Sequence, residues 1–306
     1  MKAFTKHVVV IAACILSGSI SHAQQEGMYS QYSFNLFDLI SAYCGDGQHP
    51  SLNLRYRAQW LGLPGAPRSA SASFHTPTAK ETIAWGFRLQ TEEIGARNSA
   101  EASITGAYRL STGPNSRLAF ALRAGAGNEG ISLSSLHPKD EADPLVIVGV
   151  SNRWAPLLGA SLFFRKATWY TGLEASRIIP SEYGIEADAK RRFFSHYYLA
   201  AAKVFSINEF WMLRLNALAR SLSAMRMQVE VQAAVLYRGR FWLGSGYRQE
   251  KGMLIFTEWQ ASPYFRIGYS FDTGIGGRRI YPPGHEVFIG IQFRKNNQKT
   301  PSLRLF

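Results

Sequence analysis

Period-two alternation is the feature of this sequence that most restricts its fold. In NLRYRAQWLG, residues 53–62, one set of side chains is apolar and the set between them is polar: Leu54, Tyr56, Ala58 and Trp60 alternate with Asn53, Arg55, Arg57 and Gln59. Successive side chains of an extended strand point to opposite faces. The alternation recurs in runs near residues 85, 102, 118, 213, 229, 265 and 287, with turn signals such as 113–115 between runs. The pattern predicts an all-β chain of about 14 antiparallel strands.

Two architectures bury one face of such strands, a soluble sandwich and an outer-membrane barrel. The polar faces are rich in arginine, which suits a wet lumen with pairing acids such as Glu101, Glu174 and Glu230. Aromatic residues near strand ends would form interfacial girdles, although core packing explains each one alone: Trp60, Trp154, Trp169-Tyr170, Trp211 and Trp259. Residues 287–293 have the pattern of a closing strand that ends on an aromatic residue. The sequence therefore predicts a transmembrane antiparallel outer-membrane β-barrel.

The first residues have the pattern of a secretory signal peptide, 1–23, with cleavage after Ala23. A lipoprotein site at Cys14 is the weaker alternative because the apolar run before it is short. Cleavage after Ala23 removes two lysines and lowers the formal charge from +13 to +11. Cys44 is then the remaining cysteine, so no internal disulfide can form. No later stretch has the roughly 18 apolar residues of a spanning helix.

The chain shows no linker or repeat, so we expect one barrel domain with short additions. The predicted divisions are the signal peptide, 1–23; a pre-strand segment, 24–50, as a possible plug or periplasmic contact; the barrel, 51–293; and a C-terminal tail, 294–306. Only Ile40–Gly45 or Glu186–Arg192 could form a short helix. We expect localisation in the outer membrane.

The sequence gives no sign of catalysis. It has no Gly-x-Ser-x-Gly elbow, and its histidines are not spaced as a triad or a metal site. The glycine-rich loop at 274–277 is not followed by a helix pattern, so a phosphate-binding cradle is disfavoured; its basic neighbours, Arg278 and Arg279, would lie near lipid or lipopolysaccharide phosphate. We expect no enzyme, no cofactor and no metal, and the single arginines spread over many strands argue against nucleic-acid binding.

Short motifs along the whole chain are similar to those of one family. The segments that carry this likeness are, in order, Ser30-Gln31-Tyr32, Asn35, Ala42-Tyr43 and Gly45; Tyr56-Arg57, Gln59-Trp60, Gly62, Gly65-Ala66-Pro67 and Ser73-Phe74-His75-Thr76-Pro77; Trp169-Tyr170-Thr171-Gly172-Leu173 and His196-Tyr197-Tyr198; Arg240-Phe241-Trp242-Leu243-Gly244 with Tyr247-Arg248; Arg266-Ile267-Gly268-Tyr269-Ser270-Phe271-Asp272; and Gly284-His285-Glu286. In this order they resemble the PorP/SprF family of outer-membrane proteins from the type IX secretion system of Bacteroidetes. The chain departs from the family pattern at Glu26-Gly27, near Leu36 and at Ile40-Ser41, where the family commonly has proline.

The resemblance implies a role without chemistry. Family members are associated with export, or cell-surface anchoring, of secreted proteins that carry a type IX C-terminal domain, including gliding adhesins. The implied partners are the secretion ring or translocon, a secreted client and outer-membrane lipid. The alternative is a porin for small solutes. The first predicts an occupied lumen with little conductance, and the second predicts an open lumen.

Four arginines are candidate lumenal contacts for an acidic partner segment, namely Arg55, Arg57, Arg88 and Arg109. The simpler explanation is a hydrated lining that pairs with the barrel's own acids. For His285 and Glu286, a polar contact that fixes the closing strand is the functional hypothesis, and a strand-end histidine bonded to its neighbours is the simpler one.

Overall fold

The computed structural model describes residues 29–47, 49–131, 153–179, 182–183, 191–192, 195–222, 227–249, 251–275 and 282–293. The signal-peptide region, the tail after residue 293, the second half of the glycine-rich loop at 274–277 and its neighbours Arg278 and Arg279 lie outside these ranges. So does most of Glu186–Arg192, whose last two residues form a short strand.

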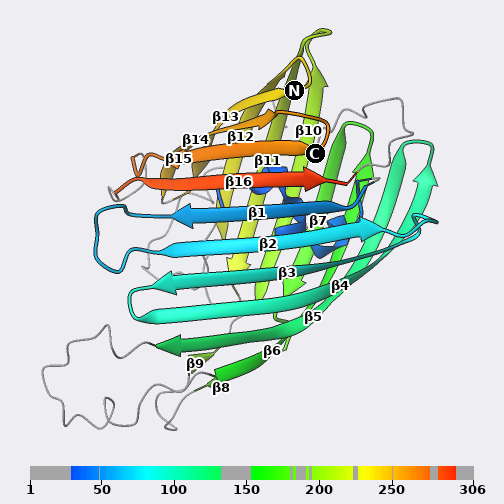
Figure 1. The fold of residues 1–306 in the computed structure, drawn as a ribbon. Helices are drawn as coiled ribbons and strands as arrows, with labels where there is room; N and C mark the ends of the chain where they lie inside the picture. The colour runs from blue at the N-terminus through cyan, green and yellow to red at the C-terminus, as the bar shows by residue number, and fades with distance from the viewer. Residues whose placement is uncertain are drawn as a thin grey trace, which may run out of the picture.

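Fourteen antiparallel strands close into one barrel, as the alternation predicts (Figure 1). The strands are β1 (Ser51–Ala58), β2 (Arg68–Pro77), β3 (Ile83–Ile94), β4 (Arg97–Gly113), β5 (Ser116–Ile131), β6 (Arg153–Lys166), β7 (Trp169–Ser176), β10 (His196–Ser206), β11 (Trp211–Leu222), β12 (Gln228–Tyr237), β13 (Phe241–Arg248), β14 (Gly252–Gln260), β15 (Phe265–Asp272) and β16 (Gly284–Gln292). The barrel closes where β1 pairs with β16, with Ser51 opposite Gln292 and Ala58 opposite His285. A separate two-stranded sheet joins β8 (Glu182–Tyr183) and β9 (Arg191–Arg192).

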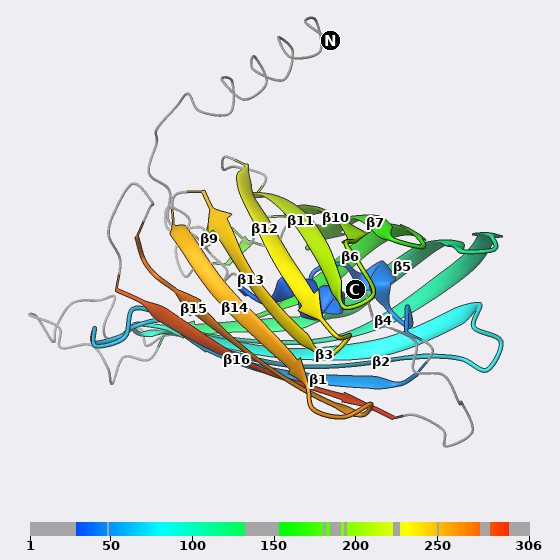
Figure 2. The same ribbon diagram turned by 90° about the horizontal axis from the view of Figure 1, so that it is seen from above.

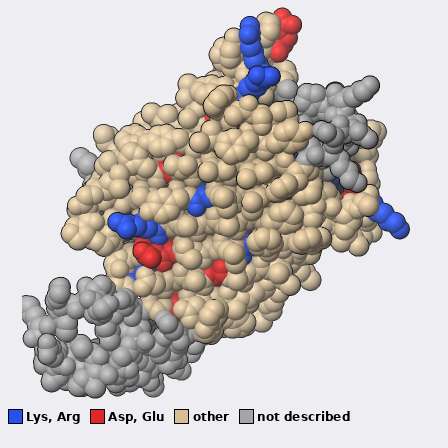
Figure 3. Space-filling model, in the orientation of Figure 1, with Lys and Arg blue, Asp and Glu red and all other residues tan. Residues whose placement is uncertain are grey.

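The two faces of the wall follow the sequence pattern. On β1 the side chains of Leu54 and Tyr56 are exposed, whereas Asn53, Arg55 and Arg57 are buried inside. The outer wall seen in Figure 3 is mostly uncharged, as a lipid-facing surface requires. Along each strand, period two therefore separates a lipid face from a lumen face.

The predicted aromatic girdles are present with one error. The tryptophans expected near strand ends point outward and are exposed: Trp154, Trp169, Trp211 and Trp259. Trp60 lies just beyond β1 in a turn with φ of 52°. Tyr170 is wrong as a girdle residue because it alternates with Trp169 and faces the lumen, where its ring lies 5.4 Å from that of Phe163.

The two ends of the barrel differ. At one end, here called the turn end, the strands are joined by short connections at 78–82, 114–115, 167–168, 207–210, 238–240 and 261–264. At the other, the loop end, the connections include long ones at 59–67, 132–152, 177–195 and 273–283. Because the strand count is even, the chain enters β1 and leaves β16 at the turn end.

Residues 29–46, which precede β1, lie inside the barrel (Figure 2). It contains three 3-10 turns, η1 (Tyr32–Phe34), η2 (Leu36–Asp38) and η3 (Ser41–Tyr43), so the short helix expected at 40–45 is a single turn. Within the described part of the chain, these turns are the only helical structure, and no helix there could cross a membrane. We call residues 29–46 the plug.

Candidate functional site

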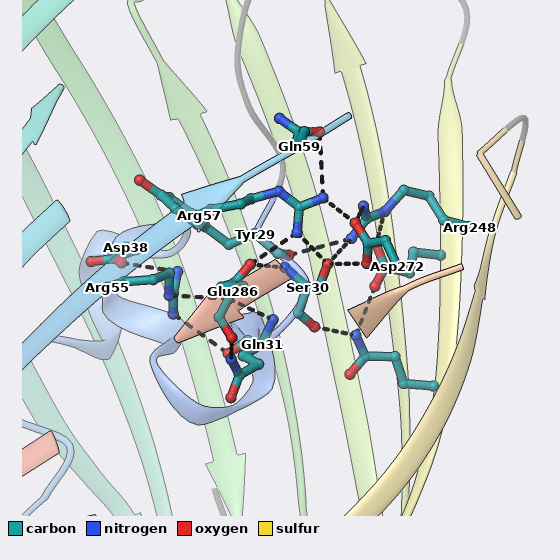
Figure 4. A network of polar contacts seen from close by, with 12 residues as sticks. Tyr29, Ser30, Gln31, Asp38, Arg55, Arg57, Gln59, Arg248, Asp272 and Glu286 are labelled. Atoms are coloured by element: carbon teal, nitrogen blue, oxygen red, sulfur yellow. Dashed lines mark hydrogen bonds and ion pairs between the residues drawn. The ribbon is translucent and has the colours of Figure 1, made fainter. Parts of the chain in front are cut away.

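The candidate functional site is the lumen and the plug that fills it. The loop end of the plug is held by a buried carboxylate on β16, shown in Figure 4. Glu286 accepts the backbone N–H of Ser30 at 2.7 Å and that of Gln31 at 3.0 Å. Its Oε2 atom also receives Nη1 of Arg57 at 3.0 Å. Glu286 is fully buried, so each of these contacts is made without competition from water.

A second carboxylate and a second arginine complete this network. Asp272 accepts the Ser30 hydroxyl at 2.7 Å and pairs with Arg57 and, at 3.7 Å, with Arg248. Arg248 pairs with Glu230 at 2.6 Å. The plug is thereby joined at one residue, Ser30, to β1, β13 and β15.

The remaining candidate arginines occupy different positions. Arg55 pairs with Asp38 of the plug at 3.2 Å and with Glu286 at 3.4 Å. Arg88 donates to the backbone carbonyl of Asp38 at 3.0 Å and pairs with Glu101 at 3.2 Å. Arg55, Arg57 and Arg88 therefore hold the chain's own plug and the barrel's own acids.

Arg109 differs from these three. It is only 3% exposed, and its two terminal nitrogens have no hydrogen-bond partner in the described residues. It lies at the turn end, where Nη1 is 3.3 Å from the position that a Cβ on Gly45 would take.

The acids predicted to line the lumen do pair with arginines. Glu101 pairs with Arg88, Glu230 with Arg248, and Glu174 with Arg123 at 3.7 Å. Glu174 also accepts the backbone N–H of Ser41 in the plug at 2.6 Å. Removing one partner of such a buried pair leaves an uncompensated charge, which costs about 3–5 kcal/mol. The charges thus fix where the plug lies along the lumen.

The turn-end half of the plug packs through apolar and aromatic side chains. Tyr43 lies edge-on to Phe163, with ring centroids 5.5 Å apart, and to His75 at 5.8 Å. Phe37 and Ile40 are fully buried in the same cluster. Burial raises the pKa of the adjacent Cys44 thiol to about 12, which keeps it protonated and unreactive at neutral pH.

Two glycines of the family-like motifs lie where the plug and the wall come very close together. Gly45 has φ of 70°, and a Cβ there would come within 2.4 Å of the Cβ of Ala84. A Cβ on Gly268 of β15 would lie 2.3 Å from Oε1 of Gln31. Both glycines let the plug and the wall approach each other.

A small cavity lies between the plug and the wall. Its volume is about 30 Å³, which is enough for one or two water molecules. Its lining includes Tyr29 and Asp38 of the plug and Arg88 and Arg123 of the wall. Lumen-facing side chains beside the plug, such as Arg57, Arg123 and Arg214, are at most 2% exposed, so side chains fill the described part of the lumen around the plug.

The structure brings many of the motif residues together at the contact between plug and wall. Those in the loop-end network are Ser30, Gln31, Arg57, Gln59, Arg248, Asp272 and Glu286. Further along the plug, Tyr32 is buried in the core cluster, Asn35 donates to Ser73, Gly45 donates to His75, and Trp242 packs on Phe34. Gly172 approaches Ile40, and Gly244 approaches Phe256.

Other motif residues lie elsewhere. Gly65 contacts Gly95 in the connections at the loop end, with Pro67 nearby in the first of them. Pro77 ends β2 at the turn end. His285 points outward to the Tyr269 hydroxyl at 2.5 Å, while the adjacent Glu286 points inward, so the two do not act as one polar contact.

Sequence reasoning missed Arg214 and the plug aromatic it covers. Arg214 donates to the Ser33 hydroxyl at 3.0 Å and lies over the rings of Trp242 and Phe34, 4.2 and 4.9 Å from their centroids. The signal was available, because Arg214 is the polar residue between Leu213 and Leu215 in a predicted strand. Nothing local indicated that its partner would come from residues 33 and 34.

Comparison with known proteins places the chain in a family. The family model described as type IX secretion system membrane protein PorP/SprF matches residues 21–291. No curated protein matches the chain.

Three solved structures are similar to the chain at low sequence identity. The CymD monoaromatic hydrocarbon channel is 10% identical, with a TM-score of 0.50 over 91% of this chain and 96% of its own. The Pseudomonas putida toluene transporter TodX is 10% identical, with a TM-score of 0.48 over 82% and 90%. Omp33 of Acinetobacter baumannii is 7% identical, with a TM-score of 0.44 over 81% and 98%.

Proposed function

The chain belongs to the PorP/SprF family of type IX secretion system membrane proteins and lies in the outer membrane. On that premise, we propose that it supports export or surface anchoring of a secreted client by docking protein partners at its two rims. The observation that carries the proposal is the plug. Residues 29–46 fill the lumen and contact strands all round the barrel. A barrel closed by its own chain is suited to hold partners and not to pass solutes.

The orientation of the barrel gives each rim a partner. In bacterial outer-membrane barrels the short turns face the periplasm and the long loops face outward. By this rule the turn end meets the periplasmic ring or translocon, and the loop end meets the secreted client. Each docks on a rim, because Arg55, Arg57 and Arg88 inside the lumen are already engaged by the plug and by the barrel's own acids.

The porin alternative is not favoured by any observation within the described lumen. A pore needs a continuous water path, whereas the plug's loop end is held by buried ion pairs and its turn end by packed aromatic rings. Planar-bilayer recording of the purified protein separates the two functions. We expect little passive conductance, and a steady open-channel current from the intact protein would favour the porin.

The direct test is affinity purification of the tagged protein from detergent-solubilised outer membranes of its native host, followed by mass spectrometry. We expect type IX ring or translocon components together with a large secreted protein. Recovery of the barrel alone, combined with ion conduction in a bilayer, would overturn the proposal. A tag after residue 293 reports the orientation as well, since it should be shielded from antibody on intact cells.

A further inference from the structure

Three arginines point into the lumen at the turn end, on adjacent strands. Arg109 lies on β4, Arg117 on β5 and Arg165 on β6. Arg117 and Arg165 are directly opposite each other in the β5–β6 register. Arg109 pairs with Ala119, two residues from Arg117, and is therefore its diagonal neighbour. Like charges directly opposite across a sheet are unfavourable, so this cluster needs anions around it.

The chain supplies two carboxylates for the three arginines. Glu81, in the connection 78–82, pairs with Arg117 at 3.1 Å, and Asp46 of the plug pairs with Arg165. Among the described residues, Arg109 forms no ion pair at contact distance, and its two terminal nitrogens are without hydrogen-bond partners; Asp46 and Glu81 favour its charge only from further away. An unpaired buried guanidinium is costly, so a third acceptor at this position would be strongly bound.

One of the two internal carboxylates is held in a way that allows replacement. Glu81 has φ of 55°, in the left-handed region that side chains other than glycine rarely adopt. Its side chain is 42% exposed and that of Arg117 is 32% exposed, so their ion pair faces the open rim. Thr82 follows Glu81 in the chain, and its backbone carbonyl accepts the backbone N–H of Arg109 at 2.7 Å. Because Glu81 pairs with Arg117 at the rim and its connection is bonded to the backbone of Arg109, we expect a shift of Glu81 to expose Arg117 first and to give access toward Arg109.

We propose that Arg109 and Arg117 form a binding site for a carboxylate of an acidic segment on a periplasmic partner, with Glu81 occupying the site when the partner is absent. The proposal rests on the proposed function through the orientation of the turn end. A protein carboxylate is the expected ligand because carboxylates already pair with Arg117 and Arg165, and a guanidinium matches a carboxylate through two parallel hydrogen bonds.

The test uses the full-length barrel in detergent and a fluorescent hexaglutamate peptide as the probe. We expect salt-sensitive binding that Arg109→Gln or Arg117→Gln weakens about tenfold or more. Glu81→Gln should strengthen binding, because it removes the internal competitor. Arg68→Gln, at the loop end, is the matched control and should leave binding unchanged.

Stability distinguishes a ligand site from a structural role for Arg109. If Arg109 is a ligand-binding residue, Arg109→Gln should keep or raise the denaturation midpoint of the free barrel, because it removes a buried charge that has no ion pair at contact distance. A lower midpoint would identify a structural residue. Weaker peptide binding in Glu81→Gln, or equal losses in Arg109→Gln and Arg68→Gln, would also overturn the proposal.

Two further outcomes separate the site from the wider function. If inorganic phosphate displaces the peptide at similar concentrations through the same arginines, the site is a general anion site and the partner assignment is wrong. If Arg109→Gln retains the periplasmic components in affinity purification from the native host, the carboxylate site is wrong while the anchoring role stands. Loss of every partner from the wild-type protein would instead remove the anchoring role.

Discussion

The two ends of the plug are held mainly by different kinds of interaction, although the last plug residue, Asp46, also pairs with Arg165 at the turn end. At the loop end, Ser30 and Gln31 present backbone groups to buried Glu286, and the arginines that neutralise it come from β1. At the turn end, Phe37, Ile40 and Tyr43 pack against the wall through apolar surface. Directional charged contacts set a unique position, whereas apolar packing adds stability and tolerates small shifts.

This difference explains how one short segment can close a barrel. Three short 3-10 turns have few internal hydrogen bonds, so the wall must specify their path. We infer that the loop end determines the plug's position along the lumen and that the turn end supplies much of its binding free energy. Five substitutions test this division.

The largest effect should come from Glu286→Ala. The change leaves Arg57 and Arg55 short of a partner and two plug N–H groups without an acceptor, all in a dry interior. We expect the free energy of unfolding to fall by about 3–5 kcal/mol. Because the plug's loop end is released, ion conductance in a planar bilayer should rise as well.

Asp272→Asn is the control for this first test. Asp272 contacts the same Ser30 and Arg57, but its side chain is 20% exposed, so water can replace part of what is lost. The loss should be smaller, with little change in conductance. Equal losses in both variants would contradict a special role for the fully buried carboxylate.

Ile40→Ala should be next in size, at about 2–5 kcal/mol, because it removes a fully buried side chain from the turn-end cluster. Since the charged contacts at the loop end are untouched, we expect stability to fall without a matching rise in conductance. Urea unfolding in lipid vesicles and bilayer recording measure the two effects. A conductance rise like that of Glu286→Ala would remove the proposed division between the two ends.

The same division shows what the sequence could predict. The fold was predictable because period two reports directly which face of a strand meets lipid, as at Leu54 and Arg55. Tyr170 shows that aromatic character is a weaker guide than period two. It is aromatic, but because it follows the outward-facing Trp169 in the strand, it faces the lumen. The lumen's pairing acids, such as Glu174, were also predictable by their place on polar faces.

The path of the plug was not predictable in this way. Glu286 and Ser30 are 256 residues apart in the chain, and nothing in the local sequence links them. The 3-10 turns have no periodicity that reports a buried face. The sequence therefore predicts an external partner for the candidate arginines, because it cannot show that Asp38 of the same chain reaches Arg55.

Titration of the Cys44 thiol, at the turn end, should have a smaller effect on the free energy of unfolding. Cys44 has its pKa raised to about 12 by burial, against about 8.5 for an exposed thiol. Between these values the unfolded chain loses the proton and the folded chain keeps it, so stability falls as pH rises. The thiol should contribute a slope of about 1.4 kcal/mol per pH unit near pH 10.

Comparison with Cys44→Ala isolates this slope. Burial also raises the pKa of Tyr29 and Tyr32, so they add a fall of the same sign at higher pH, but they do so in both proteins. The difference in unfolding free energy between the wild-type protein and Cys44→Ala should be constant below about pH 8. Above that pH it should change by about 1.4 kcal/mol per pH unit. A difference that stays flat to pH 11 would show that Cys44 is accessible to water.

The smallest effect should come from His285→Ala, one residue from the site of the largest. His285 shares β16 with Glu286 but points outward, where its Nδ1 lies 2.5 Å from the Tyr269 hydroxyl and its ring packs on Phe271. A residue on the outer wall near the strand end can be replaced at little cost, since the freed tyrosine hydroxyl lies close to interfacial water. We expect a change in unfolding free energy within about 0.5 kcal/mol and unchanged conductance. A loss approaching that of Glu286→Ala would mean that the outer hydrogen bond, and not the buried carboxylate alone, fixes the closing strand against the plug.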